Sequence, residues 1–459
     1  MLIACLFAGA SLAVVGANQA AGTARRATLF EGARLIAGDG RPPVENSAIL
    51  VEGDRISRVG KKGEVQAPAG ATRVDLTGKT VMPALIDIHN HLGWTNLKTN
   101  QATKTSFTRE LVIDHLRRYA YYGVAATLSM GLDRWNVNPD LPYQLRREIV
   151  PGAARFLTVG RGIAATPMAG PTADYRLGVP YGAQTEAEGT AIVHELKGKN
   201  VELIKIWVDD RLGTVPKLKP NVYQAIINEA HRNGMRVVAH IFAMEDGKAL
   251  LKAGVDGFAH GVRDRDVDEE YISILKQHPR TWLGPNLPAR TMSAEETAVE
   301  INWLRGSFPP SQIKRMLDQA ASRQAAQAAG RGPGGAGPND AFGIQCRNLG
   351  RVHAAGMVIG LGTDANNDIG WAAHVELADM VRCGLTPAEA IVAGTRTSAA
   401  ILKLDELGTV AAGKSADFIV LDANPLDDIL NTRRINMVYN RGTALDRAAM
   451  DRAFTSEAN

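Results

Sequence analysis

Short apolar runs alternate with helical patterns through most of the chain. Apolar side chains occupy both faces of these runs, which is typical of strands buried in a parallel sheet. Eight runs are candidate strands: 81–91, 123–131, 155–163, 201–210, 236–242, 254–262, 281–287 and 357–365. Eight strands that alternate with helices predict an α/β fold of the (β/α)8 barrel type. One helix start is well marked, because Thr386, Pro387 and Glu389 form a capping box with proline at the first helical position.

Both ends of the chain have a different sequence pattern, with short alternating apolar runs and turns rich in glycine and aspartate. We therefore expect residues 23–80 and 405–459 to form one small β-sandwich domain, and residues 81–404 to form the barrel. A long insertion at about 288–342 interrupts the barrel rhythm, with a helical pattern followed by a glycine-rich stretch. We interpret it as a partial lid over the site, with a tolerated surface insertion as the alternative.

Residues 1–22 form an apolar segment rich in small residues, and the first charged side chain is Arg25. This pattern predicts a secretory signal peptide. It therefore predicts an exported protein, periplasmic or secreted, with no stable membrane anchor once the signal is removed. A cytoplasmic protein is the alternative.

The composition, with 45% hydrophobic and 22% charged residues, is that of a soluble globular protein. The net charge of +4 comes from 52 basic and 48 acidic side chains that are interspersed along the chain. We therefore expect a small-molecule substrate and no nucleic-acid partner; the oligomeric state stays open, with a homo-oligomer possible. Cys346 and Cys383 have no C-x-x-C spacing, and we expect them to be buried as small hydrophobic residues; a disulfide between them in an oxidising compartment is the alternative.

Polar side chains interrupt the apolar candidate strands at or near their carboxyl ends. His89 and His91 close the first strand and share one of its faces, because successive side chains in a strand alternate. Lys205 lies inside the buried run 201–210, where an ammonium is almost never buried unless something pairs with it. The complete set is His89, His91, Lys205, His240, His260 and Asp364. Barrels build their active sites at this end of the strands, so the set predicts one site.

Four imidazoles, one carboxylate and one amine suit a borderline divalent metal such as zinc, and no serine or cysteine nucleophile is indicated. Six positions exceed one tetrahedral site and indicate two metals. The lysine does not fit this scheme directly. An ammonium cannot ligate a cation, and the neutral amine that burial favours is a poor bridging ligand.

A resemblance accounts for the lysine. The segments "DIHNH", "IKI", "VVAH", "FAH" and "GTDA", in this order and between two β-rich ends, closely resemble the amidohydrolase superfamily. Within it, "IKIW" and "HGVRD" look most like the Xaa-Pro dipeptidase and ochratoxinase group. The resemblance implies a lysine carboxylated by carbon dioxide, so that a carbamate on Lys205 bridges two metals. It also implies that His89, His91 and Asp364 bind one metal and that His240 and His260 bind the other.

This resemblance implies a hydrolase in which a metal-bridging hydroxide cleaves an amide bond of a small peptide or an N-acyl amino acid. Asp364 would act as general base and then as general acid. One departure bears on the substrate class: residues 160–171 replace the Gly-Gly-His-Gly turn of the dipeptidase group. An esterase, lactonase or organophosphate hydrolase on the same site is one alternative. A mononuclear deaminase is disfavoured by the lysine, and a non-catalytic metal-bound binding protein is disfavoured by the intact Asp364.

Candidate substrate contacts carry open alternatives. Arg263 can hold a substrate carboxylate through two hydrogen bonds, or can form a surface ion pair with Asp264 or Asp266. Trp94 can line the pocket or belong to the core. The pair Asp209 and Asp210 can orient metal ligands, or can simply begin a loop.

Overall fold

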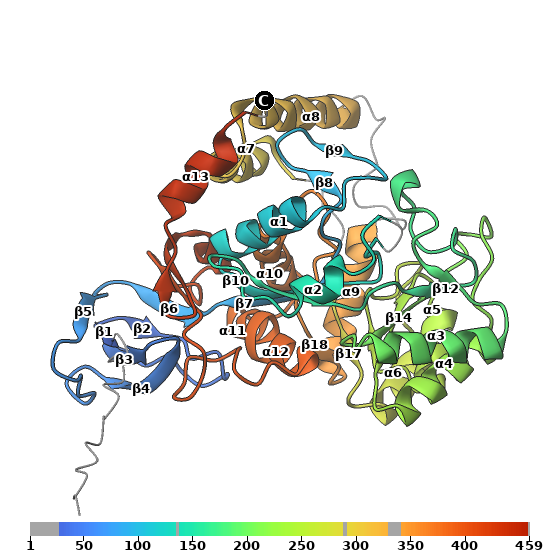
Figure 1. Cartoon of the computed structure of the whole chain (residues 1–459), viewed down its shortest axis with the longest axis horizontal. Coiled ribbons are helices and arrows are strands. Elements are labelled where there is room, and N and C mark those ends of the chain that lie inside the picture. The colour runs from blue at the N-terminus through green and yellow to red at the C-terminus, as the bar shows by residue number, and fades with distance from the viewer. Residues whose placement is uncertain (1–26, 135–136, 288–291, 329–340, 458–459) are drawn as a thin grey trace, which may run out of the picture.

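The computed structural model of the chain places a barrel of strands and helices beside a smaller β-rich region (Figure 1). It describes residues 27–134, 137–287, 292–328 and 341–457. The predicted signal peptide at 1–22 and most of the glycine-rich stretch of the insertion lie outside these residues. In the part of the chain that is described, no helix is long and apolar enough to cross a membrane.

All eight predicted barrel strands are present. They are β7 (Leu85–Asn90), β10 (Val124–Ser129), β11 (Arg155–Thr158), β14 (Ile204–Val208), β15 (Val237–Ile241), β16 (Gly257–Phe258), β17 (Trp282–Leu283) and β18 (Val358–Ile359). Two parallel arrays run in the orders β11-β10-β7 and β14-β15-β16-β17-β18, with the short strands β12 (Ile163–Ala164) and β13 (Tyr181–Gly182) added beside β14. The sheet closes where the Ile88 amide donates to the Leu361 carbonyl at 2.8 Å. The predicted (β/α)8 barrel is therefore confirmed.

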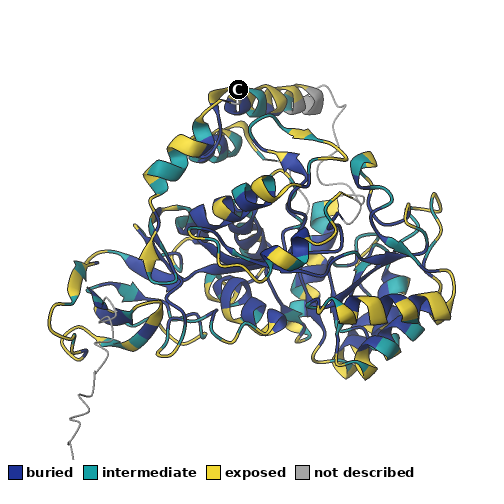
Figure 2. Cartoon of the chain, viewed as in Figure 1, coloured by how far each residue is buried: buried dark blue, intermediate teal, exposed yellow. Residues whose placement is uncertain are grey.

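Helices cover the outside of the strands, and Figure 2 shows buried strands in the middle with exposed residues on the outer faces of the helices. The helices are α1 (Arg109–Tyr121), α2 (Leu141–Leu145), α3 (Glu186–Gly198), α4 (Pro220–Arg232), α5 (Met244–Ala253), α6 (Glu269–Gln277), α9 (Ala341–Ala354) and α10 (Ala372–Arg382). The capping box at Thr386 starts α11 (Pro387–Val392), and a π-helical turn joins it to α12 (Ser398–Leu402). The marked helix start is confirmed.

Both chain ends contribute to one sheet, as expected. Its order is β2-β6-β19-β20-β21, and β19 (Phe418–Leu421) pairs antiparallel with both β6 (Thr80–Pro83) and β20 (Ile435–Asn440). The remaining strands of this region are β1 (Ala27–Glu31), β2 (Arg34–Leu35), β3 (Ser47–Glu52), β4 (Arg55–Lys61), β5 (Thr72–Asp75) and β21 (Thr443–Ala444). A second sheet, β4-β3-β1-β5, packs through Phe30 against Phe418 and Tyr439. The exact limits of this domain stay a prediction.

Two helices form the described part of the insertion, α7 (Ala294–Leu304) and α8 (Pro310–Ala328). In Figure 1 they lie in the upper lobe with the hairpin of β8 (Thr95–Asn96) and β9 (Gln101–Ala102) and with α13 (Arg447–Thr455). The side chains of Ser311 and Glu457 are hydrogen bonded at 2.6 Å, which fixes the start of α8 to the end of the chain. Whether the insertion acts as a lid stays a prediction.

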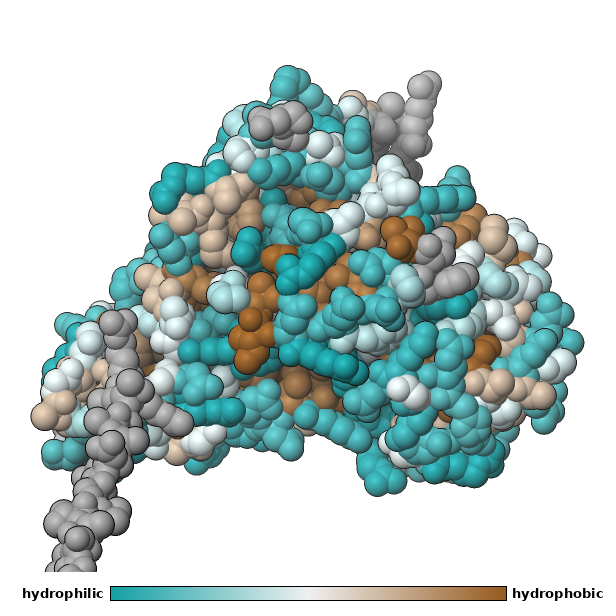
Figure 3. Space-filling model, viewed as in Figure 1, coloured by the Kyte–Doolittle hydropathy of each residue, from teal (hydrophilic) through white to brown (hydrophobic). Residues whose placement is uncertain are grey.

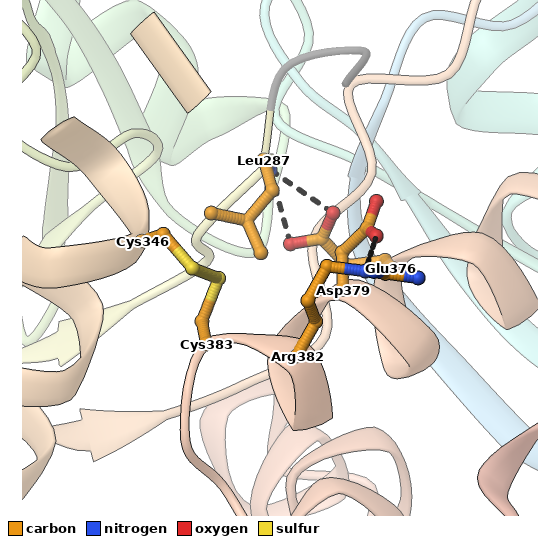
Figure 4. The surroundings of a disulfide bond; sticks show 6 residues. All are labelled: Leu287, Cys346, Glu376, Asp379, Arg382 and Cys383. Atoms are coloured by element: carbon orange, nitrogen blue, oxygen red, sulfur yellow. Dashed lines mark hydrogen bonds and ion pairs between the residues drawn. A yellow bond between two sulfur atoms is a disulfide. The ribbon is translucent and has the colours of Figure 1, made fainter. Parts of the chain in front are cut away.

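Cys346 and Cys383 form a disulfide, so the expectation that they are buried without pairing is wrong and the alternative is observed. Cys346 lies on α9 and Cys383 directly follows α10, and their Cα atoms are 4.8 Å apart (Figure 4). Nearby on α10, the carboxylate of Glu376 accepts from the Leu287 amide at 3.0 and 3.2 Å. Because the two cysteines are 37 positions apart in the chain, their spacing alone gave no sign of this contact.

Replacing both cysteines with serine should lower the free energy of unfolding by about 3–4 kcal/mol, because a disulfide that closes a loop of this length restricts the unfolded chain. Urea unfolding without reductant measures the change. The matched control is the wild-type protein in reductant, which should unfold at the urea midpoint of the double variant. Equal stability of the oxidised wild type and the double variant would contradict the pairing.

Candidate metal centre

Three predicted ligands meet at the carboxyl end of the barrel. His89 ends β7, His260 follows β16, and Asp364 follows β18; their possible ligand atoms all lie within 4.8 Å of one another. The Nε2 atom of His89 is 3.6 Å from Asp364 Oδ1, and Nε2 of His91 is 2.9 Å from the same oxygen. This group has the donor types and the spacing that a divalent metal ion requires.

His240 extends this group on the other side. Its ring centroid is 4.6 Å from that of His260, which in turn is 4.9 Å from that of His89. Asp209 Oδ2 lies 3.0 Å from His240 Nε2. Asp209 therefore contacts a predicted ligand, as expected if it orients that ligand. Asp210 instead pairs with Lys217 at 3.5 Å.

Lys205 is buried beneath these histidines, with 1% of its surface exposed. Its Nζ atom is 3.5 Å from the Met130 sulfur and 5.2 Å from the centroid of the Trp207 ring. Among the described residues no carboxylate lies within ion-pair distance of it. Burial lowers the pKa of Lys205 to about 7, although Asp364 opposes the shift and Arg263 adds to it. The amine is therefore partly neutral near pH 7.

Buried imidazoles also supply free electron pairs. Burial lowers the pKa of all four histidines, to about 4 for His240 and well below the usual value for His89 and His260. His89 Nδ1 donates to the Ala259 carbonyl at 3.1 Å, which leaves its Nε2 buried and without a hydrogen-bond partner. A neutral imidazole with a fixed tautomer and an unused nitrogen is a metal donor, so His89 fits a bound cation.

Asp87, which was not predicted, holds His89 and Thr363, the residue before Asp364, in place. Asp87 is fully buried in β7. Its carboxylate accepts hydrogen bonds from the His89 amide at 3.0 Å, the Tyr119 hydroxyl at 2.9 Å and the Thr363 hydroxyl at 2.7 Å. Asp364 itself takes a left-handed backbone, with φ of 50°, and its amide donates to the His89 carbonyl at 2.7 Å. The available signal was a charged residue two positions before His89, on the same face of an apolar strand.

Asn286 is a second residue that the sequence analysis missed. Its Nδ2 lies 2.9 Å from His260 Nδ1 and 3.3 Å from Asp364 Oδ2, so one amide links two predicted ligands. It follows β17, which is the one strand in the series β14 to β18 to which no site residue was assigned. The signal was again a polar residue at the carboxyl end of a candidate strand.

The two candidate substrate contacts differ in their placement. Arg263 faces the site, with Nη2 at 2.8 Å from the Ile241 carbonyl and 3.2 Å from His240 Nε2. Its surface-pair alternative is not observed, since Asp264 pairs with Arg265 and Asp266 with Arg347. Trp94 is fully buried and donates to the Leu132 carbonyl at 3.2 Å, so it packs in the core.

A third cation beside the site was not predicted. Arg176 is 6% exposed, and no ion pair or side-chain hydrogen bond involves it among the described residues. Its guanidinium lies 5.6 Å from the Trp94 ring centroid and 5.2 Å from that of Tyr175. It is also close enough to His91 to contribute to lowering the pKa of that imidazole, after burial and against Asp364.

Comparison with known proteins assigns this arrangement to a family. A profile of the amidohydrolase family matches residues 80–445, which is most of the chain. The chain belongs to the amidohydrolase family. Its relatives include an uncharacterized protein of Mycobacterium tuberculosis, 27% identical over 337 residues, and the imidazolonepropionase of Streptomyces avermitilis, 24% identical over 386. These alignments cover 70% and 83% of this chain, and 74% and 81% of the relatives.

Solved structures share the amidohydrolase fold over nearly the whole chain. A Xaa-Pro dipeptidase with bound methionine has a TM-score of 0.68 at 23% identity, covering 91% of this chain and 99% of that one. Molinate hydrolase has a TM-score of 0.73 at 20% identity, covering 95% and 99%. The ochratoxinase of A. niger has a TM-score of 0.64 at 20% identity, covering 92% and 96%. At these identities the likeness concerns the fold.

Replacing Asn286 with glycine should weaken metal binding about 10- to 100-fold, because residues that hold metal ligands in place contribute about that much to affinity. Glycine removes the amide and still accepts the left-handed backbone, with φ of 45° at this position. Competition with a chromophoric chelator measures the affinity. Asn46→Gly, in a turn with φ of 50° before β3, is the matched control. Unchanged affinity in Asn286→Gly would contradict the role of this amide.

Proposed function

We propose that the protein is a hydrolase with two divalent metal ions, zinc being the metal that the ligand set suits best, and that it cleaves an amide bond. The observation that carries this proposal is the burial of Lys205 among four imidazoles and Asp364 without a carboxylate partner among the described residues. A buried lysine that pairs with nothing would destabilise the fold. A modification that turns the amine into a metal ligand removes this conflict.

Carboxylation is that modification. The neutral amine of Lys205 attacks carbon dioxide, a C–N bond forms, one proton leaves, and the product is a carbamate with one negative charge. The lowered pKa of Lys205, about 7, supports this step because it keeps a neutral amine available at physiological pH. The two carbamate oxygens would then hold the two metals. His89, His91 and Asp364 would hold the first, and the second would be held by His240 and His260.

When bound, the metals would supply Lewis acidity and would lower the pKa of a bound water molecule. The residues of the chain supply the rest. Asp364 accepts the proton of the attacking water on its carboxylate and passes it to the leaving nitrogen, as general base and then as general acid. The tautomer of His89, fixed by the Ala259 carbonyl, keeps its Nε2 turned toward the site. Burial of His89 and Lys205 limits access of bulk water to these two side chains, whereas Asp364 is partly exposed on the side open to a substrate.

The substrate we propose is a small peptide or an N-acyl amino acid. Arg263 and Arg176 support a substrate with a carboxylate, because both guanidinium groups lie beside the candidate ligands and neither is within ion-pair distance of an acid among the described residues. Solved neighbours entitled Xaa-Pro dipeptidase and ochratoxinase support the same class.

We also propose export from the cytoplasm. The disulfide between Cys346 and Cys383 supports an oxidising compartment, in agreement with the apolar segment at the amino terminus.

Replacing Lys205 with alanine should remove the bridge, most of the bound metal and most of the activity. Short carboxylates such as acetate should restore part of both, because an acetate ion offers two oxygens in the space that the side chain leaves. Metal content by atomic emission, measured with and without acetate, checks this. Full activity and full metal content in Lys205→Ala would contradict the bridge.

A hydrolysis panel on the zinc-loaded protein supplied with bicarbonate tests the reaction. It holds dipeptides, N-acyl amino acids, their neutral carboxamides, aryl esters, lactones and a phosphotriester. We expect amide cleavage, and we expect Arg176→Met to raise KM for the carboxylates about 10- to 100-fold while KM for the carboxamides changes little. Arg263→Met is measured in parallel, and the variant with the larger rise in KM identifies the guanidinium that binds the substrate carboxylate. Turnover of esters or phosphotriesters alone would contradict the amidase proposal.

A further inference from the structure

A large cavity lies between the insertion and the barrel. Its volume is about 540 Å³, within the range of roughly 300–1,000 Å³ that is usual for sites of small organic ligands. Three segments line it: the loop after β7, through Leu97; helices α7 and α8; and the loop after β18, through Asn366 and Trp371. On the side viewed in Figure 3, hydrophobic surface is visible between the lobe that carries α8 and the barrel. We call this cavity the insertion chamber.

The insertion chamber is on the same face of the barrel as the metal centre. The loops that line it follow the carboxyl ends of β7 and β18, and these two strands also carry His89 and lead to Asp364. The contact is direct at Asn366, whose side-chain amide donates to the Asp364 carbonyl oxygen at 2.6 Å. A molecule bound in the chamber is therefore next to the segment that carries the proposed proton carrier.

The insertion chamber has apolar and polar walls, and two buried N–H groups in the lining have no acceptor. The two acids of the lining are already engaged, since Glu300 pairs with Arg433 at 3.7 Å and Asp368 accepts from the Asn366 amide at 3.0 Å. The apolar lining residues are Leu97, Ile301, Leu304, Phe308 and Met316. The buried Nε atom of Arg315 and the buried Nε1 atom of Trp371 make no hydrogen bond in the part of the chain that is described. No ion pair involves Arg315 there either. A buried donor without an acceptor is costly, and of these two side chains Arg315 is the one whose charge attracts an anion.

We propose that the insertion chamber binds the bulky apolar part of the substrate, and that this part carries a carboxylate which pairs with Arg315. The inference rests on the proposed amide hydrolase and deepens it. A carboxylate matches the planar guanidinium through two hydrogen bonds, and the apolar walls remove several carbon atoms from water. The substrate class then changes from small dipeptides to amides of larger aromatic or aliphatic acids with a second carboxylate away from the scissile bond.

Binding of a simple probe tests the chamber apart from turnover. The probe is 4-phenylbutyrate, with 4-phenylbutan-1-ol as its uncharged analogue, measured by calorimetry on the metal-loaded protein, which cannot hydrolyse either compound because neither contains an amide bond. We expect Arg315→Met to weaken binding of the acid about 10- to 100-fold and to leave binding of the alcohol unchanged. Met316→Trp should weaken binding of both, because it fills the chamber. Leu317→Trp is the matched control, since it is the next residue of α8 and its side chain is 39% exposed.

Three results would overturn the proposal. The first is no binding of 4-phenylbutyrate by protein with an intact Arg315. The second is equal affinity in Arg315→Met and in the parent protein. The third is binding that survives Arg315→Met and disappears when the metals are removed, because the carboxylate would then bind the metals. Each result leaves the hydrolysis panel unaffected, so a failure of the chamber is distinguishable from a failure of the proposed reaction. Arg315→Met tests the proposal even where Met316→Trp does not fold.

Discussion

The contact between β7 and the chain after β18 is the constraint on which the site depends. It closes the barrel and brings His89 next to Thr363, although 274 positions separate them, and Asp364 follows Thr363 directly. Asp87 holds this contact from within, because its carboxylate bonds the amide of His89 on one strand and the hydroxyl of Thr363 on the other. Loss of this closure would separate His89 and His91 from Asp364. It would therefore break the cluster of His89, His260 and Asp364, which is the only group of three metal-type ligands that the described residues form.

Burial determines the chemistry of the residues that the closure gathers. The histidines are held neutral by desolvation, while Asp364 stays charged: burial raises its pKa, but His89, His91 and Lys205 together hold it far below its usual value. Burial also penalises the ammonium of Lys205, because the negative charge of Asp364 only partly offsets its desolvation and Arg263 adds to the penalty. This penalty supports the proposal that the amine, rather than the ammonium, is the form of Lys205 that the protein uses.

Much of the fold and of the site could be predicted from the sequence. The eight barrel strands were found because parallel strands are continuous apolar runs, and the six polar residues were found because they end or interrupt those runs. Asp87 and Asn286 were missed because their roles are contacts across strands, to Thr363 and to His260, which no local pattern encodes. The pairing of the two cysteines could not be decided for the same reason: the distance between Cys346 and Cys383 is set by how α9 packs beside α10. The sequence could not decide between the two alternatives for Arg263, because the decision depends on which cations Asp264 and Asp266 contact in the folded chain.

We propose above all that Lys205 is a carboxylated bridge between two metals. X-ray diffraction from zinc-loaded crystals grown with bicarbonate, recorded across the zinc absorption edge, tests it most directly. We expect two anomalous peaks, one beside His89, His91 and Asp364 and one beside His240 and His260, with electron density for a carbamate joining Lys205 to both. A single peak, with density that ends at the Nζ atom of Lys205, would contradict it.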